Sequence, residues 1–334
     1  MFTMSPSVSV ALCTHNGARY VEEQVLSILN QTLPISQLVV SDDASTDNTV
    51  ALVRSVVGEF EASHPEYSLE LVVLENDEPL GVRKNFEQAV RACDGELIAL
   101  CDQDDRWRHD RLERMVEEFT ARPKLTLLHS DARLVDQAGE PLGISLMQAL
   151  GVSQLEANQI HSGDAFLTLL RRNVVTGATV VFRKGLLNHA IPFAEPWVHD
   201  EWLAMIASTV GVVDFLPEQL VDYRQHEHNQ IGAAKLSFRG KVRKLREPRD
   251  ERNQHLVSRA EALLGRLVGL DDAVPARYVR QVRAKLKHER WRRDLPVSRS
   301  MRVLPVMGSA LGGRYSRFSN GLQDVLRDIV QPDS

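Results

Sequence analysis

Short apolar runs alternate with amphipathic stretches along the first 130 residues of the chain. Each run is too short for a helix, and its composition is typical of a buried strand. The stretches between them repeat apolar residues at helical spacing, and Pro34 bars the first from continuing. This alternation predicts an α/β fold with a mostly parallel, doubly wound sheet. We expect strands at 7–13, 38–41, 69–74, 97–101 and 125–130. We expect helices at 20–29, 83–92 and 108–119, and a further helix that the residues 44–47 cap and that ends near 60.

The pattern loses its regularity after Asp131, and residues 148–163 show no clean period. Later stretches again have the composition of strands and helices. We expect a strand at 176–182, a helix at 197–209 and two closing strands at 212–216 and 220–223.

The chain changes character from Lys235 onward, where basic and apolar residues interleave at helical spacing and prolines divide the sequence into several helices. We therefore expect an α/β domain at 1–234 and a basic helical C-terminal region at 235–334. Residues 1–234 carry 17 Lys/Arg and 34 Asp/Glu, a net charge of −17. Residues 235–334 carry 23 and 11, a net charge of +12. Such a region suits anionic lipid, nucleic acid or the acidic domain itself.

Few aromatic residues and no recognition motif accompany these basic residues, so we expect no nucleic-acid partner. The stretch 303–313 is apolar and glycine-rich, which is typical of a segment in a membrane interface. A helical appendage packed on the rest of the chain is the alternative. Four arginines flank the stretch: Arg299, Arg302, Arg314 and Arg317.

The cysteines and the apolar runs indicate the cellular compartment in which the protein works. Cys13, Cys93 and Cys101 lie inside apolar runs and are expected to be buried thiols of a reducing compartment. We see no signal peptide, and no apolar run approaches the roughly 20 residues that a spanning helix needs. We expect a cytoplasmic protein, with peripheral contact at the inner face of the cytoplasmic membrane.

Three carboxylates follow the apolar run 97–101 directly: Asp102, Asp104 and Asp105. In an extended backbone Asp102 and Asp104 share one side and Asp105 turns the other way. Carboxylates this close repel one another unless a cation lies among them, and hard oxygen ligands suit Mg²⁺ or Mn²⁺. The alternative is a solvated acidic loop that caps the next helix.

A series of motifs is spread over residues 7–232. The motifs are Thr14–Gly17, Glu22–Gln24, Leu29–Thr32, Ser41–Asp47, Gly81–Phe86, Asp102–Trp107, His199–Trp202 and Tyr223–His226. With these motifs the sequence resembles the inverting family 2 glycosyltransferases, which have the GT-A fold, and within them the rhamnosyltransferase-like branch of bacterial surface-polysaccharide synthesis. On this resemblance, about 1–131 form the nucleotide-sugar half and 132–234 the acceptor half.

The resemblance implies a nucleotide pocket at the ends of the first two strands. Thr14 and Asn16 would line it. Asp42 or Asp43 would accept the N3–H of a uracil or thymine ring, with helix capping as the alternative role.

The resemblance also implies a diphosphate and metal site. Lys84 or Arg83 would contact the nucleotide or its phosphates, unless they are surface charges. Asp102 would lie near the ribose and Asp104 would bind Mn²⁺ or Mg²⁺. His226 would be a third metal ligand or a donor to the diphosphate.

On the acceptor side, the resemblance makes Asp200 the general base, with a helix N-cap as its alternative role. Glu201 is the competing base, because relatives commonly carry Glu before Asp and this chain has the reverse order. Trp202 would stack on an acceptor sugar or fill the core, as would Trp197. Gly177 would let the acceptor approach the backbone closely.

These expectations combine into one function: transfer of a sugar, rhamnose by resemblance, from a UDP- or dTDP-sugar to a glycan. The glycan would be lipid-linked, as in O-antigen, capsule or exopolysaccharide synthesis. Nucleotidyl transfer is a second reading, although the chain lacks a basic, glycine-rich loop at its N-terminus. A non-catalytic nucleotide- or sugar-binding scaffold is the third.

Overall fold

The computed structural model describes residues 5–225 and 249–332. The chain divides into two compact units. The first comprises the described residues up to Ala165, Val174–Phe193 and the described residues from Val198 to 225. The second comprises Phe166–Asn173, Ala194–Trp197 and residues 249–332.

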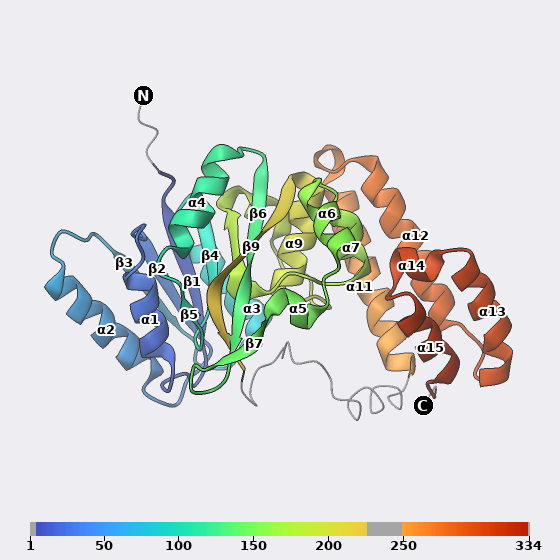
Figure 1. The fold of residues 1–334 in the computed structure, drawn as a ribbon, viewed down its shortest axis with the longest axis horizontal. Coiled ribbons are helices and arrows are strands. Elements are labelled where there is room, and N and C mark those ends of the chain that lie inside the picture. The colour runs from blue at the N-terminus through green and yellow to red at the C-terminus, as the bar shows by residue number, and fades with distance from the viewer. Residues whose placement is uncertain (1–4, 226–248, 333–334) are drawn as a thin grey trace. The chain divides into compact units, whose positions relative to one another are not determined.

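The first half of the central sheet is parallel, as the alternation of strands and helices predicts (Figure 1). Its strands lie in the order β3-β2-β1-β4. Of these, β1, β2 and β4 are almost wholly buried. Burial on both faces is the reason that these runs are continuously apolar. The elements are β1 (Val8–Thr14), α1 (Val21–Leu29), β2 (Gln37–Asp42), α2 (Thr49–Ser63), β3 (Glu70–Glu75), α3 (Val82–Ala92) and β4 (Leu97–Asp102).

The second half of the sheet is mixed. Strand β8 pairs antiparallel with both β4 and β6, whereas β9 runs parallel to β6. The two closing strands expected at 212–216 and 220–223 form the single strand β9, because shifts of register against β6 absorb the residues between them. The elements are β5 (Arg106–Trp107), α4 (Arg111–Ala121), β6 (Leu125–Val135), β7 (Pro141–Ser145), β8 (Val180–Arg183), α8 (Leu187–Ala190), α9 (His199–Val210) and β9 (Val212–Arg224).

Two local features differ from the prediction. Helix α4 begins at Arg111 rather than at 108, because Arg106–Trp107 pair with β9 as β5. Residues 146–171 form three short helices, α5 (Leu146–Leu150), α6 (Gln154–His161) and α7 (Ala165–Arg171). Each has only one or two turns, too few for a clear period, but capping boxes at Ser145 and Ser153 mark two of their starts.

The described residues of the second unit form helices and their connections and contain no strand, which confirms the predicted C-terminal helical region. Its helices after residue 248 are α11 (Arg249–Gly269), α12 (Ala276–Arg293), α13 (Arg299–Leu311), α14 (Arg314–Phe318) and α15 (Leu322–Val330). No helix within 5–225 or 249–332 is long and apolar enough to cross a lipid bilayer.

The register of the sheet decides where the polar residues meet. Thr14 at the end of β1 pairs with Asp42 of β2, and Cys13 pairs with Asp102 of β4. The carboxyl ends of three neighbouring strands therefore bring the predicted donor residues to one edge of the sheet. Ligands bind at this edge in open α/β sheets.

Candidate active site

Asp42 lies at the centre of a hydrogen-bond network at the ends of β1 and β2. Its Oδ1 accepts from Thr14 Oγ1 and from Ser45 Oγ, each at 2.6 Å. Its Oδ2 accepts from the Ser45 backbone N–H at 2.8 Å. The buried carboxylate thus holds the loop between β2 and α2 in place.

Asp43 anchors the start of α3. Its carboxylate accepts from the backbone N–H groups of Leu80 at 2.5 Å and Gly81 at 2.9 Å. Gly81 has a φ of 80°, which favours glycine at this entry into the helix. Both predicted base-binding carboxylates therefore shape loops of the chain, and recognition of a pyrimidine N3–H by either stays a prediction.

Asn16 joins the first loop to the second. Its side-chain oxygen accepts from the Thr46 backbone N–H at 2.9 Å, and its own backbone N–H donates to Ser45 Oγ at 2.8 Å. Asn16 has a φ of 49°, a conformation that asparagine tolerates better than most residues. Thr14 and Asn16 thus belong to one connected pair of loops at the sheet edge.

Gln103 is a site residue to which sequence reasoning assigned no role. Its side-chain Oε1 accepts from the His15 backbone N–H at 2.8 Å, and its Nε2 donates to the His15 carbonyl at 3.0 Å. A Cβ on Gly17 would lie 2.0 Å from Gln103 Oε1. The position of Gln103 between Asp102 and Asp104 could have marked it as a site residue. Its bonding partner could not be predicted, because His15 is 88 residues away in the chain.

Asp102, Asp104 and Asp200 form an acidic cluster that joins the two predicted halves. Burial, followed by the charges of Asp104 and Asp200, raises the pKa of Asp102 to about 7. The charge of the predicted general base therefore acts on the predicted donor carboxylate at the end of β4. Mutual repulsion of this kind is relieved by a bound cation.

The described residues contain no group of three His, Cys, Asp or Glu side chains that could hold a metal ion by themselves. His226, predicted as the third ligand, lies outside the described residues. Mg²⁺ in nucleotide sites is commonly held by one or two carboxylates together with substrate phosphates. The carboxylate of Asp104, the predicted metal ligand, fits that mode.

The backbone turns at Gln103 and Asp104, so the extended conformation expected for Asp102–Asp105 is wrong, and Asp105 follows this turn. It is buried, and burial followed by the charges of Asp104 and Asp102 raises its pKa well above the usual range. Its Oδ1 accepts from the Arg224 backbone N–H at 2.9 Å. The Arg224 side chain donates to the Asp104 carbonyl at 2.8 Å and to Glu23 at 2.7 Å. Arg224 therefore connects the end of β9 to the acidic loop.

Asp200 lies in the first turn of α9 with its carboxylate held at both oxygens. Oδ2 accepts from the Gly177 backbone N–H at 2.9 Å, and Oδ1 accepts from the Glu201 N–H at 2.6 Å. Val198 occupies the N-cap position of α9, so the alternative role of Asp200 as N-cap is wrong. Gly177 contacts the candidate base directly, while contact of Gly177 or Glu201 with an acceptor stays a prediction.

His199 fills the space beside Gly177. Its ring stacks on Phe86 with centroids 3.8 Å apart, and burial lowers its pKa to about 3. A Cβ on Gly177 would lie 2.8 Å from His199 Nε2, so only glycine fits here without movement of the ring. The buried imidazole is neutral, and it packs against Gly177, whose N–H binds Asp200.

The predicted stacking of Trp202 on an acceptor sugar is wrong in this structure. Its side chain is 0% exposed, and the indole N–H donates to the Ala190 carbonyl at 2.6 Å. Trp197, in the second unit, is also buried and donates to the Arg259 carbonyl at 3.0 Å. Both tryptophans are therefore core residues. Trp202 lies two positions after Asp200 on α9, which places the two side chains on different sides of the helix.

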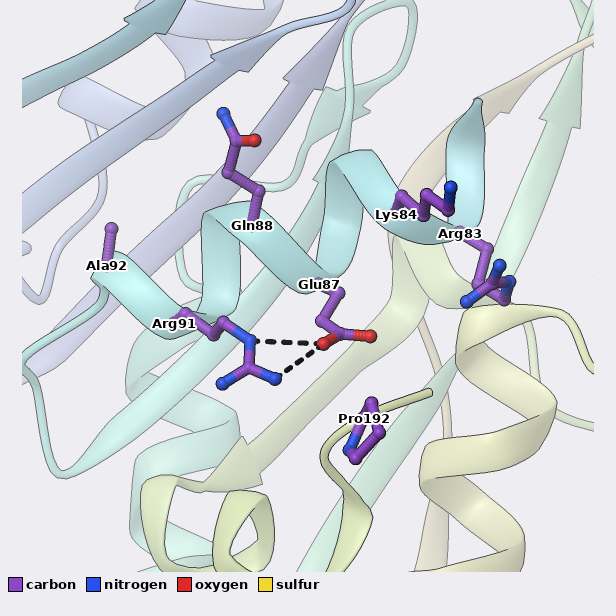
Figure 2. Close-up of a pocket in the computed structure, with 7 residues that line it drawn as sticks. All are labelled: Arg83, Lys84, Glu87, Gln88, Arg91, Ala92 and Pro192. Carbon is purple, nitrogen blue, oxygen red and sulfur yellow. Dashed lines mark hydrogen bonds and ion pairs between the residues drawn. The ribbon is translucent and has the colours of Figure 1, made fainter. Parts of the chain in front are cut away.

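Lys84 lies exposed on α3, beside Arg83, which donates to the Phe193 carbonyl at 2.8 Å. Figure 2 shows both in a pocket of about 630 Å³, in which Arg91 and Glu87 form an ion pair at 2.6 Å. No carboxylate of the acidic cluster lines this pocket, so a phosphate contact of Lys84 stays a prediction. The remaining lining residues are Gln88, Ala92 and Pro192.

Comparison with known proteins gives the family. Residues 9–187, more than half of the chain, match the model of glycosyl transferase family 2. The chain therefore belongs to this family and is a glycosyltransferase by class. It is 27% identical to the dTDP-rhamnosyl transferase RfbG of Shigella flexneri over 70% of this chain and 78% of RfbG. It is 30% identical to the putative teichuronic acid biosynthesis glycosyltransferase TuaG of Bacillus subtilis over 42% of this chain and 53% of TuaG.

Solved structures confirm the fold. S. aureus TarS 1-349 in complex with UDP matches with a TM-score of 0.55 and 16% identity, covering 97% of this chain and 88% of that one. The mannosyltransferase PcManGT of Pyrobaculum calidifontis, in complex with GDP-Man and Mn²⁺, matches with a TM-score of 0.51 and 20% identity over 98% and 86%. The fold is GT-A, as the resemblance implied.

Proposed function

We propose that the protein transfers a sugar, with inversion, from a UDP- or dTDP-sugar to a glycan acceptor in a metal-dependent reaction. The observation that carries this proposal is that Asp102, at the carboxyl end of β4, is subject to the charges of both Asp104 and Asp200, whose carboxylate is held by the Gly177 N–H. Donor and acceptor chemistry each need a carboxylate there, and the two must lie close together.

On the donor side, Asp104 would hold Mn²⁺ or Mg²⁺ together with diphosphate oxygens, and His226 is proposed as a further ligand. Asp102 would lie near the ribose. A bound cation would neutralise charge on the leaving diphosphate. Gln103, which ties this loop to His15, would set the position of both carboxylates. Thr14, Asn16 and Asp42 or Asp43 would form the nucleotide side of the site.

On the acceptor side, Asp200 would take the proton of the attacking hydroxyl. The acceptor oxygen then bonds to the anomeric carbon while the bond to the diphosphate breaks, and the electron pair leaves with the diphosphate. A single displacement of this kind inverts the anomeric centre. The Gly177 N–H orients the Asp200 carboxylate for this role, and Glu201 is the alternative base.

The relatives support the choice of donor and pathway. RfbG is named a dTDP-rhamnosyl transferase, TuaG is named for teichuronic acid synthesis, and TarS binds UDP and UDP-GlcNAc in crystals. We propose a UDP- or dTDP-sugar, with rhamnose favoured by RfbG, and a lipid-linked acceptor in surface-polysaccharide synthesis at the cytoplasmic membrane face. The transferase domain would be 1–234, with nucleotide-sugar and acceptor halves that meet near 131, and 235–334 would be the C-terminal region.

Thermal melting with UDP, dTDP, GDP and ATP, each with and without Mn²⁺, tests the proposal. A ligand at about 100 times its Kd adds roughly 2.7 kcal/mol to the free energy of unfolding, a visible shift. We expect a UDP or dTDP shift that needs Mn²⁺ and is absent in Asp104→Ala. A metal-dependent preference for ATP would indicate nucleotidyl transfer instead, and no response to any nucleotide would indicate a scaffold.

A further inference from the structure

Helices α13 and α15 of the second unit carry leucines and methionines on their outer faces. On α13, Leu304 is 83% exposed and Leu311 is 86% exposed, and Met301 and Met307 lie on the same face. On α15, Leu322 is 79% exposed, and Leu326 and Val330 follow at successive turns. We call these residues the apolar face. Exposed apolar side chains gathered on two helices that contact each other point to an interaction site.

The interior beneath the apolar face is ionic. Asp328 of α15 is fully buried and accepts from Arg292 Nε at 2.6 Å and from the Tyr315 hydroxyl at 2.7 Å. It also accepts from Arg252. Asp324, one turn earlier on α15, is buried beside Arg292 as well. Helix α15 thus turns Asp324 and Asp328 inward together with Val325, while Leu322 and Leu326 point outward.

The apolar face is held rigidly in place. Arg302, which the sequence placed among the flanking arginines, is buried instead and donates to the carbonyls of Pro296, Val297 and Gln331 at 2.5, 2.5 and 2.8 Å. It ties α13 to the end of α15, and the two helices pack side by side (Figure 1). Val306, on the same side of α13 as Arg302, is buried in a small core with Tyr315. The outward leucines therefore belong to a folded, fixed surface.

Charge selects the partner. Arg299 is the first residue of α13, and Arg314 and Arg317 lie on α14, which follows it. All three are exposed. Residues 235–334 carry a net charge of +12. A second copy of the chain would bring this positive charge against itself, whereas lipid phosphates would complement it. Apolar side chains flanked by arginines are the composition of helices that lie in a membrane interface.

We propose that the apolar face of α13 and α15 docks onto an anionic membrane surface, with its leucines in the acyl boundary and Arg299, Arg314 and Arg317 on lipid phosphates. The docking does not depend on the transferase activity. It gives the chain a fixed attachment at the site where lipid-linked acceptors would be found.

Co-sedimentation of the full chain with lipid vesicles tests the proposal. We expect binding to phosphatidylcholine vesicles that contain phosphatidylglycerol, weaker binding to phosphatidylcholine alone, and loss of binding as salt rises. The variant with Leu304→Gln, Leu311→Gln and Leu322→Gln should bind the anionic vesicles at least about tenfold less, because each leucine loses apolar burial. No binding of the unaltered chain to anionic vesicles would overturn the proposal.

Matched variants locate the effect. Leu155 on α6 is 67% exposed, and Leu155→Gln should bind vesicles normally. Removing three charges at Arg299, Arg314 and Arg317 should weaken binding more than removing three at Arg280, Arg283 and Lys287 of α12. Equal losses would show attraction by the whole basic region and would overturn docking through this face.

Two further readouts separate the alternatives. Light scattering reports oligomeric state, and a dimer that the triple leucine variant turns into a monomer, with vesicle binding unchanged, would assign the face to a second copy. The nucleotide-dependent melting shift should be the same in all these variants, because none alters the acidic cluster. The variants should also melt at the same temperature as the unaltered chain, since the changed side chains are exposed.

Discussion

Gln103 occupies both backbone hydrogen-bonding groups of His15 through a single side-chain amide. The Oε1 atom accepts from the His15 N–H at 2.8 Å and Nε2 donates to the His15 carbonyl at 3.0 Å. This pair of bonds fixes the loop after β4, with Asp102 and Asp104, to the loop after β1, with Thr14 and Asn16. The relative position of the two loops decides whether the donor residues act on one ligand.

Gln103→Ala should weaken nucleotide binding more than it weakens folding. Loss of the two bonds should cost roughly 1–3 kcal/mol of folding free energy and release the acidic loop. We expect a higher KM for the sugar donor and a smaller Mn²⁺-dependent melting shift with UDP or dTDP. Gln154→Ala is the control, because that side chain bonds only Asn158 on the exposed side of α6. Equal KM values for the two variants would contradict the positioning role.

Gly17→Ala should disturb the same contact from the other side. The added Cβ would lie 2.0 Å from Gln103 Oε1, so the Gln103 side chain would have to leave His15. We expect lower stability and weaker nucleotide binding, measured by thermal melting with and without ligand. Gly58→Ala in α2 is the matched control, because nothing lies within 4 Å of its Cβ position. It should raise the free energy of unfolding by about 0.5–1 kcal/mol, the helical preference for alanine.

Asp200→Asn should remove the general base and leave the fold intact. We expect kcat to fall by roughly 10²–10⁴-fold, while UDP or dTDP with Mn²⁺ still raises the melting temperature. Glu201→Gln, measured beside it with the same donor and acceptor, decides between the two carboxylates. A large loss of kcat in Glu201→Gln with little change in Asp200→Asn would transfer the role of base to Glu201.

His129 should make the fold sensitive to acid. Burial lowers its pKa from 6.5 to about 4, with a smaller opposing effect from Asp214 and a further lowering by His161. In the unfolded chain His129 therefore binds a proton near pH 6.5, whereas in the folded chain it binds one only near pH 4. The free energy of unfolding therefore falls as the pH drops from 6.5 to about 4. His129→Phe, which keeps a ring beside Phe215, should reduce the pH dependence of the melting temperature between 6.5 and 4. His109→Phe, at an exposed position, should leave it unchanged.

Local pattern was sufficient for much of the fold. Apolar runs bounded by turns placed β1, β2, β3 and β4 within a residue or two. For β1, β2 and β4 the reason is burial on both faces, which leaves a continuous apolar run in the sequence. It failed where pairing is set by distant residues. β5 has only two residues and exists because Arg106 and Trp107 meet β9, more than 110 residues away.

The candidate site divides in the same way. The acidic residues at strand ends and the motifs around Asp102, Asp104 and Asp200 are readable in the sequence, since parallel strands end at one edge. Gln103 and Arg224 were missed as connectors, because their partners are remote in the chain. Trp202 was misassigned because an aromatic ring reads alike in a sugar site and in a core.

The sequence by itself determined the family, the α/β order of the first domain and the basic helical character of the second region. Tertiary structure alone decided which way the side chains of that region face. Asp324 and Asp328 turn inward to Arg292, while Leu322 and Leu326 turn outward. Apolar residues of α15 lie on both sides of the helix, so hydrophobicity along the chain does not fix its orientation. The pairing of Arg252 and Arg292 with the buried Asp328 does, because a buried carboxylate without a partner is costly.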